Sequence, residues 1–214
     1  MTQRCGLWLS AGLSFNTTQE VDAVHQHLEG LFGTPLRADD DNGMALFVGQ
    51  SFGFELWFRH YAIKDAGRAF VMRADTPLHL AAMDDVDPFD FTGHFLRWFA
   101  QQSPFPWKTS DASSNPNIQC SFKVPLVSAV ANDDDLRQTL GRLLGVAWQP
   151  GSGGWSGQGF GFRLSLRSGQ HDDGSVTWFE GVGPTNGDEP QPVDISDHFL
   201  LWFADDDSGQ RLLR

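Results

Sequence analysis

One short segment of the sequence has the spacing of a serine-hydrolase nucleophile. Residues 49–53 read Gly-Gln-Ser-Phe-Gly and match the pattern Gly-x-Ser-x-Gly. That chemistry needs the serine on a sharp turn between a strand and a helix. Here the pattern leads into alternating apolar residues, which favour a strand, and the related segment 157–161 has Gly159 in place of Ser51. We therefore expect a tight turn and close strand packing at this place, with no nucleophile.

An acidic segment at 39–43, Asp-Asp-Asp-Asn-Gly, raises the possibility of a calcium loop. An EF-hand loop with its glycine at 43 would begin at Ala38 and need a glutamate at 49, where the sequence has Gly49. We expect an exposed acidic turn here, no metal site and no cofactor. The acidic residues that remain candidates for contact with a partner are Asp39, Asp40, Asp41, Asp84, Asp85, Asp172 and Asp173.

Two histidines occur in a repeated pattern that could supply a general base. The pattern Asp-x3-His-x3-Trp occurs twice, as Asp90, His94, Trp98 and as Asp194, His198, Trp202. A histidine beside an aspartate can move protons, but no second catalytic residue recurs with either one. His25 and His27 stand two apart, so they cannot share one helical face as metal ligands. We expect the two recurring histidines to pack at the start of a helix and predict no catalytic residue.

The pattern lies inside a longer repeated segment. Residues 88–100 and 192–204 share eight of thirteen positions, and residues 49–59 resemble 157–167 in the same order. Two matches at nearly equal offsets indicate duplication of a unit of about a hundred residues, which is the size of a domain. We predict a first repeat over 1–101, a linker over 102–118 and a second repeat over 119–214.

Each repeat has the pattern of one small α+β unit. A strand near 5–13 or 119–127 is followed by a helix, with caps at Thr17 or Thr18 and at Asn132 and with Gly33 or Gly145 at its end. Two or three strands come next, and the repeated segment closes the unit as a helix capped by its aspartate. The expected fold is a tandem β-α-β-β-β-α duplication, with antiparallel sheets and helices packed on one face.

The cysteines allow a comparison of the two first strands. Cys5-Gly-Leu-Trp-Leu aligns with the internal segment Cys120-Ser-Phe-Lys-Val, so the N-terminal segment is interpreted as a strand and not as a cleaved signal. Whether the two thiols pair is left open. No apolar run reaches the roughly 18 residues of a membrane span, which favours a cytoplasmic protein with no membrane partner.

The two repeats differ on one strand face. Opposite the phenylalanines of 52–58 the first repeat carries Glu55, Trp57 and Arg59, whereas the second repeat has Ser165 in place of the tryptophan. A tryptophan on the polar face of a strand is either covered by another part of the protein or anchors a partner. Glu55, Trp57 and Arg59 are therefore candidates for partner binding.

Composition limits the class of partner. The 214 residues have a formal net charge of −12 and include 18 Phe and 8 Trp but one Tyr. Nucleic acids and anionic membranes attract cationic surfaces, so neither is the expected partner. A basic protein is.

Acidic, aromatic-rich α+β proteins without a catalytic constellation resemble, in general character, the immunity proteins that bacteria pair with polymorphic toxins. The resemblance implies a non-enzymatic inhibitor of a cognate toxin, present as a monomer (a pseudo-dimer of repeats) or a weak homodimer. One alternative is an enzyme or small-ligand binder that uses a groove between the repeats, with His94, His198, Asp90 and Asp194. A second alternative is a structural or scaffold component.

Overall fold

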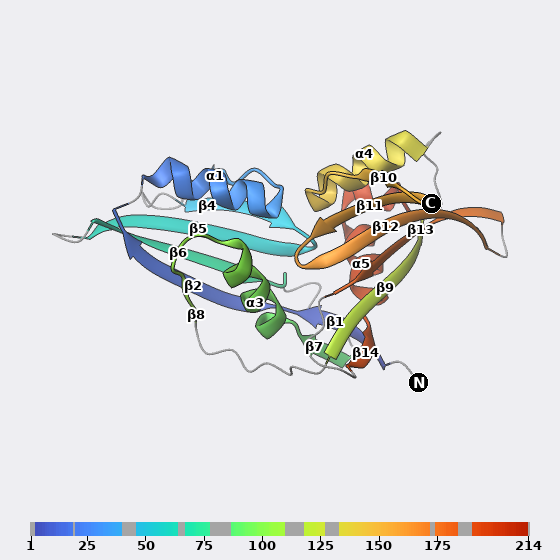
Figure 1. The fold of residues 1–214 in the computed structure, drawn as a ribbon, viewed down its shortest axis with the longest axis horizontal. Coiled ribbons are helices and arrows are strands. Elements are labelled where there is room, and N and C mark those ends of the chain that lie inside the picture. Colours follow the sequence, from blue (N-terminus) through green and yellow to red (C-terminus); the bar gives the residue numbers. More distant parts are fainter. Residues whose placement is uncertain are drawn as a thin grey trace. The chain divides into compact units, whose positions relative to one another are not determined.

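A computed structural model describes residues 3–18, 20–39, 46–63, 67–77, 87–109, 118–126, 133–171, 174–183 and 190–213. The fold is α+β, and its sheets are mostly antiparallel, as predicted (Figure 1). The chain divides into two compact units. We call residues 8–77 and 90–114 the N-terminal unit, and residues 1–7, 78–89 and 115–214 the C-terminal unit.

The N-terminal unit contains one six-stranded sheet, in the order β3-β4-β5-β6-β2-β8. The bounds are β2 Ser10–Thr17, β3 Arg37–Asp39, β4 Leu46–Ser51, β5 Phe54–Ile63, β6 Gly67–Asp75 and β8 Lys108–Thr109. Every neighbouring pair of these strands is antiparallel.

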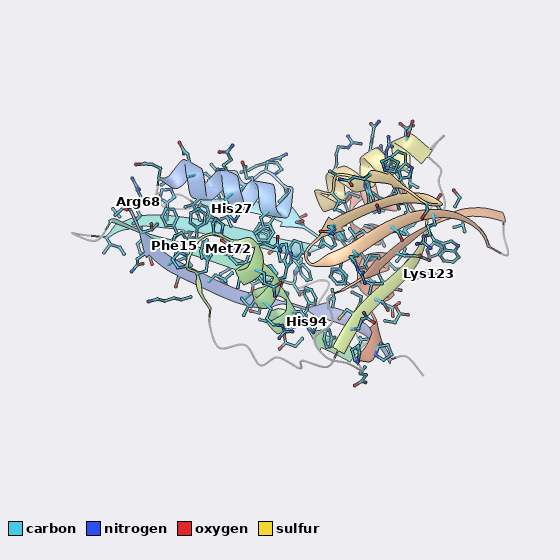
Figure 2. All side chains as sticks on the ribbon, viewed as in Figure 1. Phe15, His27, Arg68, Met72, His94 and Lys123 are labelled. Atoms are coloured by element: carbon cyan, nitrogen blue, oxygen red, sulfur yellow. The ribbon has the colours of Figure 1, made fainter. Side chains whose placement is uncertain are left out.

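Two helices of this unit, α1 (Val21–Phe32) and α3 (Thr92–Gln102), contribute to one aromatic core. Phe32 of α1 lies 6.3 Å from Phe95 and 6.0 Å from Phe99 of α3, between ring centroids. Phe15 and Met72, labelled in Figure 2, are 3% and 1% exposed. The alternating pattern therefore buries one face of this sheet, as expected for a half-buried strand.

The C-terminal unit contains an eight-stranded sheet, in the order β10-β11-β12-β13-β9-β14-β1-β7. The strands are β1 Gln3–Trp8, β7 Asp87–Asp90, β9 Ile118–Leu126, β10 Gln149–Gly151, β11 Gly154–Gly159, β12 Phe162–His171, β13 Gly174–Val182 and β14 Gln191–Asp194; the helices are α4 Asp133–Leu144, α5 Ser196–Asp205 and α6 Asp207–Gln210. β14 pairs in parallel with both β9 and β1, which explains why residues 1–7 belong to this unit.

A two-residue turn joins β4 to β5, and another joins β11 to β12. Phe52 and Gly53 have φ of 55° and 76°, and Phe160 and Gly161 have 50° and 82°. Two consecutive residues at positive φ match the turn that suits the twist of a hairpin. A phenylalanine rarely adopts this conformation. Here both rings are 1% exposed, so burial of the ring offsets the backbone strain.

The start of α3 and the start of α5 make matching hydrogen bonds to the first long strand of each half. The N–H of Phe91 donates to the Trp8 carbonyl (2.7 Å), and that of Ile195 donates to the Ser121 carbonyl (2.8 Å). The residue before the acceptor is Leu7 in the first bond and Cys120 in the second. These bonds therefore do not match Cys5 with Cys120, which is the alignment predicted from residue type. Cys120 is a buried free thiol.

The predicted order of elements was too simple in each half. Short strands β3 and β7, and likewise β10 and β14, lie between the helices in addition to the three predicted ones. Strands of three or four residues have too little alternation to be recognised. The predicted cap of α1 is also wrong: Thr17 ends β2, and the helix begins at Val21 with Glu20 as its N-cap residue.

Other predicted boundaries agree with the structure. Gly33 ends α1 with φ of 63°, and Gly145, after α4, has φ of 62°, the left-handed conformation expected after a helix. Asn132 lies outside the described residues. The predicted linker over 102–118 contains regular structure, since Gln102 ends α3, Lys108–Thr109 pairs with β2 and Ile118 begins β9.

Candidate protein-binding surface

Strand β5 places the three candidate residues on the side away from the core. Phe54, Leu56 and Phe58 are each 1% exposed, whereas Trp57 between them is 41% exposed. Successive side chains of a strand point to opposite faces, so Glu55, Trp57 and Arg59 share the outer face. The structure thus leaves the Trp57 ring accessible, as the partner-anchor hypothesis requires.

The neighbouring strands add charged groups around this ring. Trp57 is paired with Val48 of β4 on one side and with Arg73 of β6 on the other. Arg73 Nε lies 3.1 Å from Asp75 Oδ2, and the Ser10 hydroxyl donates to Asp75 Oδ1 at 2.9 Å. These contacts hold Arg73 on the outer face beside the indole.

Tyr61 was missed by the sequence analysis. It lies on β5 four residues after Trp57, which places it on the same face, and it is 54% exposed. The period of two could have revealed it, but the predicted strand stopped at Arg59. We call Glu55, Trp57, Arg59, Tyr61 and Arg73 the Trp57 surface.

Arg59 is half-buried in this surface. Within the part of the chain that the structure describes, its guanidinium makes no hydrogen bond or ion pair, and its Nε is buried. Buried N–H groups in native proteins are usually hydrogen-bonded, so this one is unusual. Glu55 is also half-buried and faces Gln50 and Asp75 across the sheet.

The outer face of the other sheet is arranged differently. Ser165 on β12 occupies the place of Trp57, counted from the hairpin turn, and the tryptophan of this face is Trp178 on β13. Lys123 Nζ lies 4.5 Å from the Trp178 ring centroid and 3.0 Å from Glu180 Oε1. Figure 2 labels Lys123 on β9. Because Lys123 lies over its ring, Trp178 is a weaker candidate for an anchor than Trp57.

The acidic candidates are described only in part. Asp39 is exposed on β3, an edge strand of the N-terminal sheet. Asp40, Asp41, Asp84, Asp85, Asp172 and Asp173 lie outside the described residues.

The N-cap residues of α3 and α5 are Phe91 and Ile195, so the predicted caps Asp90 and Asp194 lie one residue too early, although each bonds to the first residue of its helix. Asp90 Oδ1 accepts the Thr92 N–H at 2.9 Å, and Asp194 Oδ1 accepts the Ser196 N–H at 2.9 Å. The Ser196 hydroxyl also donates to Asp194, at 2.6 Å. Such bonds satisfy N–H groups that have no partner within the helix.

His94 and His198 are buried at the starts of α3 and α5, 3% and 1% exposed. His94 stacks on Phe91 at 5.8 Å between centroids, and His198 meets Phe199 edge-on at 5.3 Å. Burial, and to a smaller extent the charge of Arg97, lowers the pKa of His94 to about 4. A neutral packed ring agrees with the predicted structural role of this histidine.

The two tryptophans of the repeated pattern differ in exposure. Trp202 is 6% exposed, whereas Trp98 is half-buried, so only one of them is enclosed as expected.

The geometry around Ser51 differs from that of a serine nucleophile. Ser51 is fully buried at the end of β4, and its hydroxyl donates to the Phe32 carbonyl at 2.9 Å. A hairpin turn follows, where a nucleophile would need a helix. Its side chain therefore stabilises the end of α1.

The described residues form neither a metal cluster nor a membrane-spanning helix. Among them, no group of three or more His, Cys, Asp or Glu is placed to hold a metal ion. None of the helices they form is long and apolar enough to cross a membrane.

Comparison with known proteins gave no match to a family model, to a curated protein or to a solved structure.

Proposed function

We propose that this protein is a non-enzymatic binding protein that recognises another protein through the Trp57 surface. The observation that carries the proposal is the joint exposure of Trp57 (41%) and Tyr61 (54%) on one face of β5, beside Arg59 and Arg73. Trp, Tyr and Arg are the residue types that dominate the energy of protein interfaces. Large apolar side chains grouped on a surface mark such interfaces.

The proposed partner is a basic protein. The net charge of −12 attracts a cationic partner over long distances and raises the association rate. The Trp57 surface itself is nearly balanced in charge, because Arg73 pairs with Asp75, and Glu55 and Arg59 on the same strand face carry opposite charges. Charge thus guides the encounter, and contact with the aromatic rings holds the complex together.

An immunity-type inhibitor of a cognate toxin fits this description. Many toxins of that kind present basic clefts for nucleic acid, to which an acidic protein binds by charge complementarity. The proposal includes a cytoplasmic location and a monomer in which two repeats form a pseudo-dimer.

The tandem duplication is part of the same proposal. It is supported by the matching pairs of hydrogen bonds at α3 and α5, by the two Phe-Gly turns at positive φ, and by the two aspartates that each bond to the first residue of a helix. Duplication accounts for a shared scaffold whose outer faces carry different residues.

The test is affinity capture from the native host, followed by binding measurements with the purified partner. Trp57→Ala/Tyr61→Ala should weaken binding at least tenfold, since buried interface anchors are each worth about 2 kcal/mol or more. Trp178→Ala is the matched control, because it removes the outer-face tryptophan of the other sheet. Equal binding by the wild type and the Trp57→Ala/Tyr61→Ala variant would rule out this surface.

A further inference from the structure

The C-terminal unit contains a cavity on the inner side of its sheet. Its volume is about 170 Å³, and its walls include Leu136 of α4, Trp155 of β11, Leu166 and Ser168 of β12, and Thr177 of β13. It therefore lies between a helix and three neighbouring strands.

The Trp155 ring in this wall is held from one side by a cation. The Arg137 guanidinium carbon lies 3.9 Å from the ring centroid, and Arg137 also pairs with Asp134 at 3.0 Å. A guanidinium over an indole stabilises that ring in one orientation. The aromatic wall is thus already in place without a ligand.

The corresponding place in the N-terminal unit is filled by two rings. Counted from the glycine of each hairpin turn, Ser168 corresponds to His60, and both have a cross-strand partner on the next strand. That partner is Thr177 for Ser168 and Phe70 for His60. Phe70 is fully buried, and the His60 ring lies 6.1 Å from it.

The helix side corresponds in the same way. His25 of α1 lies 4.5 Å from the Phe47 ring, as Arg137 of α4 lies over Trp155. The two units therefore share the framework of helix, cation or imidazole, and aromatic strand residue. They differ in one cross-strand pair, which is His60 and Phe70 in the N-terminal unit and Ser168 and Thr177 in the C-terminal unit.

Two small hydroxyl side chains in place of two rings account for the cavity. The cavity is partly open to solvent, since Ser168 is exposed while Trp155 and Thr177 are half-buried. Among the described residues, neither Ser168 nor Thr177 has a hydrogen-bond partner, so both hydroxyls can bond to a molecule in the cavity.

We propose that this cavity binds a small molecule with one aromatic ring and one hydroxyl or N–H group. A cavity of about 150 Å³ lined by apolar residues binds benzene, so a single ring fits the volume. Trp155, Leu136 and Leu166 contact the ring, while Ser168 and Thr177 bond its polar group. The rings of His60 and Phe70 in the other unit demonstrate that this framework accommodates aromatic groups at this place.

The first experiment measures phenol and benzene binding to the full chain by ligand-observed NMR and calorimetry. Phenol should bind with a Kd on the order of 1 mM, as expected for a ligand of about seven non-hydrogen atoms. Ser168→His/Thr177→Phe gives the C-terminal unit the residues of the N-terminal unit and should abolish binding of both ligands. Ser165→His is the matched control on the outer face of the same strand and should leave binding unchanged.

A second variant tests the polar contact. It also tests the proposal if the cavity-filling variant Ser168→His/Thr177→Phe does not fold. Ser168→Ala/Thr177→Val removes both hydroxyls with little change in volume. Phenol binding should weaken about three- to tenfold, the effect of one lost hydrogen bond, while benzene binding stays the same. Absence of phenol binding to the folded wild type, or binding that survives the filled variant, would overturn the proposal. So would equal phenol affinity without the hydroxyls. Trp57→Ala should not affect this binding, so the result is independent of the proposed protein partner.

Discussion

The same residue type has different roles in this protein according to its exposure. Trp57 is 41% exposed and is proposed as an anchor, whereas Trp202 is 6% exposed and packs 5.2 Å from the Phe203 ring. Trp98, at the matching place in α3, is half-buried and lies 6.0 Å from Phe32. An exposed ring is available to a partner, and an enclosed one contributes to stability.

Trp202→Ala should destabilise the fold by about 3–5 kcal/mol, the usual cost of removing an enclosed aromatic ring. Trp98→Ala should cost less, because part of that ring is already in contact with water. Denaturant unfolding of both variants measures the difference. Equal losses for the two would contradict the assigned exposures.

His94 should make the stability of the protein depend on pH. Its pKa is lowered from 6.5 to about 4 by burial and by Arg97, so the neutral ring is the form that packs. The packed neutral ring contributes up to about 3 kcal/mol to the free energy of unfolding. This contribution is fully present above pH 6.5 and is lost as the pH falls toward 4. Burial lowers the pKa of His27 and His60 as well, in the same direction.

His94→Gln isolates that contribution. The variant should be modestly less stable at pH 7, and its unfolding free energy should fall less than that of the wild type between pH 6.5 and 4. Partner binding should be unchanged once the protein is folded. Loss of a measured activity in the folded variant would instead support the enzyme alternative.

At the scale of elements, glycine is favourable in the hairpin turns and unfavourable within the helices. Gly53 lies in a turn at φ of 76°, whereas Gly30 is exposed within α1 and has open space where a Cβ would be. A side chain is strained in the first conformation and favourable in the second.

Gly53→Ala should therefore destabilise the N-terminal unit by roughly 1–2 kcal/mol. Gly30→Ala is its control and should stabilise the protein by about 0.5–1 kcal/mol. Thermal or denaturant unfolding gives both values. A stabilising Gly53→Ala substitution would mean that the turn has another conformation.

For the whole molecule, the net charge of −12 should control how fast a basic partner associates. Exposed charges are screened beyond about 10 Å at 0.1 M salt, so the association rate should fall steeply as salt is raised from about 50 to 500 mM. Stopped-flow or surface-based kinetics with the captured partner measures this rate. A rate that does not change with salt would remove the reason for preferring a basic partner.

Two substitutions separate the long-range and short-range contributions. Changing Asp39, Asp40 and Asp41 to Asn should slow association more than it speeds dissociation. Trp57→Ala should do the reverse, because short-range contacts act mainly on the dissociation rate. The same kinetic assay tests both, and the opposite assignment of effects would contradict the proposed division between charge and aromatic contact.

The sequence by itself determined the local features of this protein. The apolar spacing predicted one buried face of α1, made of Val21, Val24, Leu28, Leu31 and Phe32. Of these, Val24, Leu28 and Phe32 are buried and the other two are half-buried, and Gly33 marked the end of the helix. Asp90 and Asp194 were recognised as marking helix starts, each one residue before the N-cap residue. These features depend on neighbours within a few residues, so periodicity and residue type are sufficient to predict them.

Only the tertiary structure decided what depends on residues distant in the chain. Strand pairing placed β1 beside β14, far from it in the chain. The neighbouring strands leave Trp57 exposed, whereas Lys123 lies over Trp178. Ser168 and Thr177 face one cavity because two separate strands bring them together. Strand register and the burial of side chains by neighbouring strands depend on pairing between distant segments. A local pattern predicts only which face of each strand points toward the core.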